Sequence, residues 1–105
     1  MSDVEQAAGP DDVGAHVEIY TWGSCSYCLA AKRVLQKKEV TFVEHAIDGD
    51  DAARDAMMRR TGGRRTMPQI FINGQAIGGY IELQRLEQMG QLDGLLAMPP
   101  GGTAS

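Results

Sequence analysis

The chain of 105 residues lacks any apolar run close to the roughly 20 residues that a transmembrane helix needs, so it predicts no membrane span. Its first residues are acidic and contain neither the basic segment nor the apolar core of a secretory signal. We therefore expect a cytoplasmic protein. The length is enough for one small domain and no more.

Basic residues are missing from the start of the chain: the first twelve residues contain four acidic residues and no Lys or Arg. The net charge of −4 arises in this segment, since the other ten acids are balanced by ten basic residues. A neutral domain without aromatic residues among its arginines disfavours nucleic-acid binding. We expect flexible tails at 1–15 and 98–105 around a domain at 16–97.

Cysteine is scarce: Cys25 and Cys28 are the only two in the chain. A structural zinc site needs four ligands, and the two histidines, His16 and His45, lie far apart in the sequence. A structural disulfide across so short a loop would add little stability. A Cys-x-x-Cys pair between a strand and a helix is typical of a redox site, which suits a reducing compartment.

The position of Cys25 predicts its chemistry. A β-rich segment at 17–21 precedes it, and a helical repeat begins directly after it. At the start of a helix the free backbone N–H groups and the positive end of the helix dipole favour a thiolate, so we expect Cys25 to be the nucleophile. Cys28, one turn into the helix, is placed to form a disulfide with Cys25 or to resolve a mixed one.

Periodicity and turn residues define the remaining elements. We expect helical apolar stripes at Ala31, Val34 and Leu35, and later at Ile81, Leu83 and Leu86. Strand, helix and strand in that order predict two parallel strands. The expected strands are 17–21, 40–44, 69–72 and 75–77, and the expected helices are about 26–38, 51–61 and 80–89, with a short helical turn at 93–97.

Three motifs in this order resemble the glutaredoxins. They are Cys25-Ser26-Tyr27-Cys28, Thr66-Met67-Pro68 and Gly78-Gly79-Tyr80-Ile81-Glu82-Leu83. The likeness spans about residues 16–97, and the small bacterial glutaredoxins with two active-site cysteines are the most similar group. It implies the α/β thioredoxin-like fold, with a four-stranded mixed sheet in the order β-α-β-α-β-β-α.

The resemblance also implies the roles of individual residues. Cys25 matches the nucleophile and Cys28 the resolving cysteine, while the proline of the second motif matches one that is cis throughout the fold. The carboxylate of Glu82 is expected to receive the γ-glutamyl ammonium of glutathione, and Arg65 or Arg64 its glycyl carboxylate. The implied glutathione-binding residues are Tyr27, Arg65, Thr66, Met67, Pro68, Gly79, Tyr80, Ile81 and Glu82.

The sequence departs from the family at several positions. Ser26 stands where proline is frequent, Trp22 where lysine is frequent, and Ile81-Glu82 where many members have Asp-Asp. Trp22 is equally compatible with packing and with a place beside the glutathione groove. For Arg59 and Arg60 we favour an ordinary solvated face, and for His45 a structural role.

The resemblance implies a glutathione-dependent thiol-disulfide oxidoreductase that reduces protein–glutathione mixed disulfides and protein disulfides. Glutathione would be the co-substrate, disulfide-containing or glutathionylated proteins the partners, and the monomer the expected state. The alternative is a dimer that binds a [2Fe–2S] cluster through Cys25 of each subunit and two glutathiones. A thioredoxin is disfavoured, because thioredoxins usually carry Gly-Pro between the cysteines and lack the Gly78-Gly79 motif.

Overall fold

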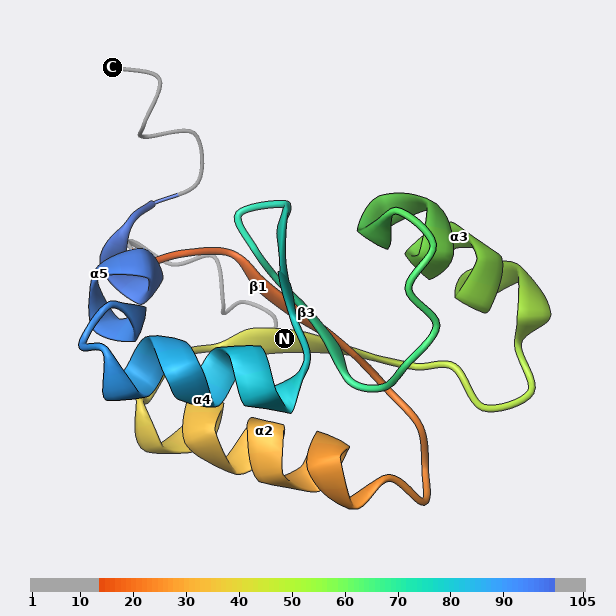
Figure 1. Cartoon of the computed structure of the whole chain (residues 1–105), viewed down its shortest axis with the longest axis horizontal. Helices are drawn as coiled ribbons and strands as arrows, with labels where there is room; N and C mark the ends of the chain where they lie inside the picture. Colours follow the sequence, from red (N-terminus) through yellow and green to blue (C-terminus); the bar gives the residue numbers. More distant parts are fainter. Residues whose placement is uncertain (1–13, 100–105) are drawn as a thin grey trace, which may run out of the picture.

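The computed structural model describes residues 14–99, which form a sheet with helices on both faces (Figure 1). The order of strands and helices matches the predicted one. No helix in these residues is long and apolar enough to cross a membrane. The elements are β1 (Val17–Thr21), α2 (Ser26–Lys37), β2 (Phe42–Ala46), α3 (Asp51–Thr61), β3 (Gln69–Ile72), β4 (Gln75–Gly78), α4 (Tyr80–Gln88) and α5 (Leu92–Ala97).

The sheet has the strand order β2-β1-β3-β4. β1 runs parallel to β2 and antiparallel to β3, and β3 and β4 form the hairpin predicted at Asn73-Gly74. Asn73 and Gly74 both have positive φ (52° and 81°), which is the conformation that a two-residue hairpin of this kind requires. The predicted mixed sheet and thioredoxin-like fold are confirmed.

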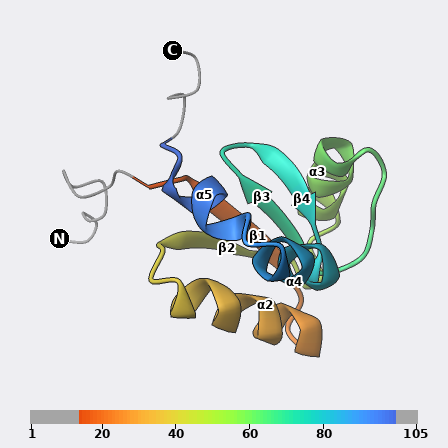
Figure 2. The same cartoon turned by 60° about the vertical axis from the view of Figure 1, so that its left-hand side comes forward.

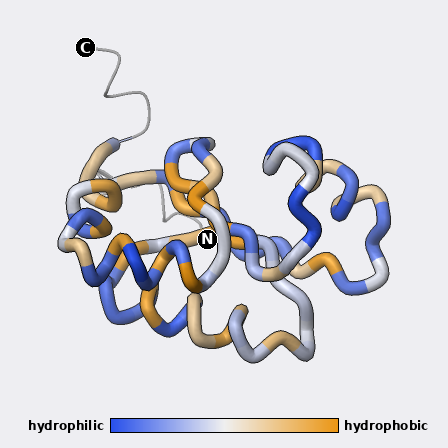
Figure 3. The backbone as a smooth tube through the Cα atoms, in the orientation of Figure 1, coloured by the Kyte–Doolittle hydropathy of each residue, from blue (hydrophilic) through white to orange (hydrophobic). Residues whose placement is uncertain are grey.

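Side chains of the two central strands, β1 and β3, point alternately to the two faces of the sheet, so apolar residues lie on both faces. On one face, Val17 and Ile19 pack with Ile70 in a cluster covered by α2, α4 and α5 (Figures 1 and 2). On the other face, Tyr20 and Phe71 pack with residues of α3. Figure 3 shows that α3 is mostly hydrophilic, and only its Met57 is buried. The larger core therefore lies beneath α2 and α4.

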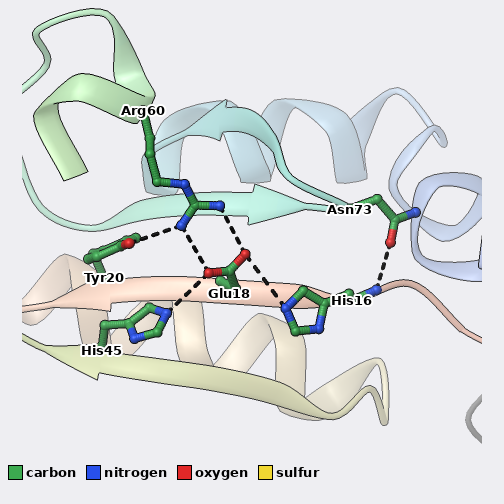
Figure 4. Close-up of polar contacts among 6 residues, drawn as sticks. All are labelled: His16, Glu18, Tyr20, His45, Arg60 and Asn73. Carbon is green, nitrogen blue, oxygen red and sulfur yellow. Dashed lines mark hydrogen bonds and ion pairs between the residues drawn. The ribbon is translucent and has the colours of Figure 1, made fainter. Parts of the chain in front are cut away.

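A charged network lies on the α3 face of the sheet, centred on Glu18 of β1 (Figure 4). The guanidinium of Arg60 donates to both carboxylate oxygens of Glu18, at 2.9 and 3.0 Å, and lies 3.9 Å from the ring centroid of Phe71. His45 of β2 lies 3.1 Å from the same carboxylate, and its ring is 4.6 Å from that of Tyr20. The network joins α3 to two strands.

Some expectations differ from the structure. The second strand was predicted at 40–44 but spans Phe42–Ala46, because Val40 instead packs at the edge of the core after the turn at Glu39. Arg60 is not part of a free solvated face, since it is bound to Glu18, whereas His45 has the expected structural role. The predicted tails at 1–15 and 98–105 lie mostly outside the described residues.

The Glu18 network predicts a stability that depends on pH. Hydrogen bonds from Arg60 lower the pKa of Glu18 to about 2, and His45 adds to the effect. A carboxylate with a lowered folded-state pKa stabilises the fold above its ordinary pKa, and this contribution disappears as the pH falls from about 4.5 to about 2. The side chain is only 14% exposed, so we expect about 3 kcal/mol from this one group.

The measurement is the unfolding free energy of wild type and Glu18→Gln between pH 7 and pH 2 in denaturant titrations. The difference between them should shrink steadily as the pH falls below about 5. Asp55→Asn, at an exposed acid of α3, is the matched control. A difference that stays constant over the whole range would contradict the argument.

Candidate active site

The first cysteine stands where β1 ends and α2 begins. Cys25 is the N-cap of α2, and its sulfur accepts a hydrogen bond from the backbone N–H of Cys28 at 3.1 Å. The turn before it is held by a hydrogen bond from the N–H of Cys25 to the carbonyl of Trp22, and by one from the N–H of Gly23 to the Asp48 carboxylate. The sulfur thus meets the helix N-terminus, where a negative charge is stabilised.

Cys28 has a different environment, although it lies only three residues further along. Its side chain is 2% exposed, and both cysteines are free thiols. Burial raises the pKa of Cys28 to about 12, and the neighbouring sulfur of Cys25 adds to this rise. Cys28 is therefore protonated at neutral pH, and only Cys25, which is half-buried, is accessible as a nucleophile.

The second motif of the sequence lies beside the first. The Met67-Pro68 peptide bond is cis, as the resemblance implies. The carbonyl oxygen of Met67 lies 3.8 Å from the sulfur of Cys25, although the two residues are 42 positions apart. Pro68 is buried, and Gln69 secures this turn by donating from its amide to the carbonyl of Thr66 at 2.9 Å. The backbone carbonyl of Met67 therefore flanks the sulfur of Cys25.

The third motif begins α4 at the same place. A Cβ on Gly79 would lie 3.2 Å from the carbonyl oxygen of Pro68, and one on Gly78, where φ is +120°, would lie 2.8 Å from Cγ of Glu82. The positive φ of Gly78 favours glycine there, and a side chain at Gly79 would crowd the backbone of Pro68. The carboxylate of Glu82 accepts from the N–H of Gly79 at 2.8 Å, and this hydrogen bond lowers its pKa. The other oxygen of Glu82 lies 3.6 Å from Arg64.

These segments enclose a groove of about 190 Å³. Of the nine glutathione-binding residues predicted from the sequence, eight line it; the exception is Arg65, which is exposed, while its neighbour Arg64 lines the groove. Ile81, expected in the apolar stripe of α4, is 52% exposed instead. The lining residues are Tyr27, Arg64, Thr66, Met67, Pro68, Gly79, Tyr80, Ile81 and Glu82.

Two aromatic rings form part of this groove. Tyr27, which is 57% exposed, and Tyr80 are stacked with ring centroids 5.9 Å apart. The amide of Gln84 donates to the hydroxyl of Tyr80 at 3.1 Å. An exposed ring held by a neighbouring ring is a preformed apolar surface, which is suited to contact with a ligand or a partner protein.

A second cavity, of about 290 Å³, lies between α2 and the end of β2. It is lined by both cysteines and by Trp22, Lys32 and Glu44 among others, and it shares no residue with the groove. Trp22 packs against the α3 side of the core with Arg54 above its ring, so it flanks this cavity and not the groove. The cysteine pair thus lies between two cavities of different composition.

Sequence patterns alone did not identify the polar group of the second cavity. Lys32 binds both carboxylate oxygens of Glu44 at 3.1 and 3.0 Å, and Thr21 donates to one of them at 2.6 Å. The partner of Lys32 lies on β2, so the pairing depends on the sheet register and not on a local pattern. Among residues 14–99, no three His, Cys, Asp or Glu side chains form a group that could hold a metal ion.

Comparison with known protein sequences supports the resemblance. The family model described as Glutaredoxin matches residues 17–77. A protein named a probable glutaredoxin from Synechocystis is 57% identical over 90 residues, which cover 86% of this chain and 83% of that protein. Glutaredoxin 3 of Escherichia coli is 51% identical over 82 residues, covering 78% of this chain and 98% of that protein.

Solved structures give the same result. The solution structure of glutaredoxin from Brucella melitensis superimposes with a TM-score of 0.72 at 40% identity, covering 85% of this chain and 95% of that one. The crystal structure of a buckwheat glutaredoxin–glutathione complex has a TM-score of 0.72 at 26% identity, covering 78% and 76%. The fold is therefore that of these proteins.

The contrast between the cysteines predicts selective alkylation. With iodoacetamide at neutral pH, we expect the reduced folded protein to be modified at Cys25 while Cys28 stays unmodified, because Cys28 is buried and its pKa is raised to about 12. Peptide mass spectrometry measures both sites, and the chain unfolded in guanidinium, where both should react, is the control. Equal labelling in the folded protein would contradict the assignment.

Proposed function

Because the chain belongs to the glutaredoxin family, we propose that its thiol-disulfide oxidoreductase activity depends on glutathione. The observation that carries the proposal is the groove beside Cys25, which is lined by eight of the nine residues that the sequence predicts for glutathione binding. A structural relative is known as a complex with glutathione. The reducing cytoplasm predicted from the sequence is the compartment that supplies this thiol.

The groove offers complementary charges to a zwitterionic peptide. Glutathione has two carboxylates and one ammonium, and the groove has the guanidinium of Arg64, the carboxylate of Glu82 and the N-terminus of α4. A carboxylate is favoured at a helix N-terminus and against a guanidinium. The carboxylate of Glu82, one oxygen of which is held by Gly79, faces the same groove and can receive the ammonium.

The proposed reaction begins with the thiolate of Cys25, which attacks the glutathionyl sulfur of a protein–glutathione mixed disulfide. The protein thiol leaves as a thiolate and takes up a proton, and glutathione remains bound to Cys25 through a disulfide. A second glutathione thiolate then attacks the glutathionyl sulfur of this disulfide, releasing oxidised glutathione and reduced Cys25. Cys28 takes no part in this sequence.

Protein disulfides need both cysteines. After Cys25 has formed a mixed disulfide with the substrate, Cys28 attacks Cys25, the second substrate thiol leaves, and an intramolecular disulfide remains. Two glutathiones then reduce it. Glutaredoxins have potentials of about −200 to −230 mV, which is close to the cytosolic glutathione potential, so the reaction can run in both directions.

The [2Fe–2S] hypothesis stays a prediction from the sequence. It needs Cys25 and a bound glutathione from each of two subunits, so a single chain supplies one protein ligand. Ser26, where proline is frequent, is the first residue of α2 and lies directly after that ligand. We rank this function second, because the groove supports glutathione binding without requiring a dimer.

The first test is glutathione-coupled reduction of a small glutathionylated disulfide by wild type, Cys25→Ser and Cys28→Ser. We expect Cys28→Ser to remain active and Cys25→Ser to be inactive, because only Cys25 is accessible and lies at the helix N-terminus. The reverse pattern would overturn the assignment of the nucleophile. Inactivity of the wild type would overturn glutathione dependence and bring the cluster hypothesis forward.

The second test separates the two neighbouring arginines. We expect Arg64→Gln to raise the KM for glutathione by about three- to tenfold, the effect of losing one charged hydrogen bond at a partly exposed site. Arg65→Gln should raise it less, because Arg65 does not line the groove. Arg59→Gln, on exposed α3, is the control, and a larger effect at Arg65 than at Arg64 would restore the assignment made from the sequence.

A further inference from the structure

The second cavity contains a lysine that the reaction described above does not use. Lys32 follows Cys28 by four residues on α2, one helical turn, so the two side chains lie on the same face of the helix. Both line the cavity of about 290 Å³, together with Cys25. The ammonium of Lys32 is therefore the positive charge of the cavity that also contains the buried thiol.

The position of this ammonium is fixed by a chain of contacts. The carboxylate of Glu44 accepts from it through both oxygens, at 3.1 and 3.0 Å, and the hydroxyl of Thr21 holds that carboxylate from the end of β1 at 2.6 Å. Thr21 is buried, and the side chain of Lys32 is only 24% exposed. These contacts place the ammonium of Lys32 at the cavity.

Cys28 needs such a charge at one step only. Its thiol must lose a proton before it can attack Cys25, and burial opposes the charged form. A nearby ammonium offsets part of that cost, and a backbone hydrogen bond from Trp22 acts in the same direction. The titratable and charged groups on this cavity are Cys25, Cys28, Lys32 and Glu44.

We propose that Lys32, held by Glu44 and Thr21, is a positioning residue for the resolving step, in which it stabilises the thiolate of Cys28. In that step the Cys28 thiol gives its proton to solvent and its sulfur bonds to the sulfur of Cys25. The bond between Cys25 and the substrate sulfur breaks, and the substrate leaves as a thiolate. The two cysteines lose two electrons in the whole reaction, and the substrate disulfide gains them.

The inference rests on the roles proposed above for Cys25 and Cys28 and not on glutathione. Lys32 should therefore act on reactions that need both cysteines and not on those that need Cys25 alone. Reduction of protein disulfides would then depend on Lys32, whereas removal of glutathione from proteins would not. The groove would set the affinity for glutathione, and the cavity would set the rate at which mixed disulfides are resolved.

The test is a stopped-flow reaction of the reduced protein with a substoichiometric chromogenic aromatic disulfide. Attack by Cys25 releases one coloured thiolate in a phase whose rate depends on protein concentration. Attack by Cys28 releases the second in a phase that does not. We expect Lys32→Met to slow the second phase roughly three- to tenfold, the effect of one partly exposed charge, and to move its pH profile to higher pH. The first phase should keep its rate.

Several variants make the result decisive. Lys32→Arg, which keeps the charge, should restore most of the second phase, and Lys37→Met, another lysine of α2, should leave both phases unchanged. If the second phase keeps its rate in Lys32→Met, the inference is wrong. It is also wrong if the second phase is as slow in Lys32→Arg as in Lys32→Met.

The same experiment separates this inference from the proposed roles of the cysteines. Cys28→Ser should release a single equivalent of coloured thiolate, and Cys25→Ser should release almost none. If Cys25→Ser still shows a fast first phase, the proposed nucleophile is wrong. If only the effect of Lys32 is missing, the cysteine roles stand and the inference about Lys32 fails.

Discussion

The packing of α2 beneath β1 is the constraint on which the site depends. Ala31 and Leu35 of α2 are fully buried against Ile19 and its neighbours, which fixes the start of the helix at the end of the strand. Cys25 becomes the N-cap for that reason, and Cys28, on the inner face of the first turn, is buried with the core residues. One packing arrangement thus leaves Cys25 half-buried and accessible, whereas Cys28, three residues later, is buried.

This difference divides the chemistry into two parts. The accessible sulfur can react with a disulfide from outside, whereas the buried one stays protonated until a mixed disulfide brings a reactive sulfur within reach. We propose that different surfaces serve the two parts: the groove is formed by the Met67-Pro68 turn and α4, and the cavity by α2 and β2. Substitutions on one surface can therefore alter one half of the chemistry while the other half is retained.

Much of the fold could be predicted because its signals are local. Alternating strands, the Asn73-Gly74 turn and the Cys-x-x-Cys between a strand and a helix each lie within a few residues. The contacts that the sequence did not reveal are long-range: Arg60 with Glu18, and Lys32 with Glu44, depend on the helix and strand register across the sheet. In the same way, a difference of one residue in a loop decides that Arg64 and not Arg65 lines the groove.

Glu82 illustrates how a departure from the family pattern can be understood only with the structure. Compared with aspartate, its extra methylene lets the side chain fold back over Gly78, whose missing Cβ leaves the necessary room. One carboxylate oxygen then caps α4 at the N–H of Gly79, and the other faces Arg64 across the groove. The longer side chain therefore caps α4 and still presents a negative charge to the groove. For this reason glutamate at this position is compatible with the proposed binding of an ammonium group.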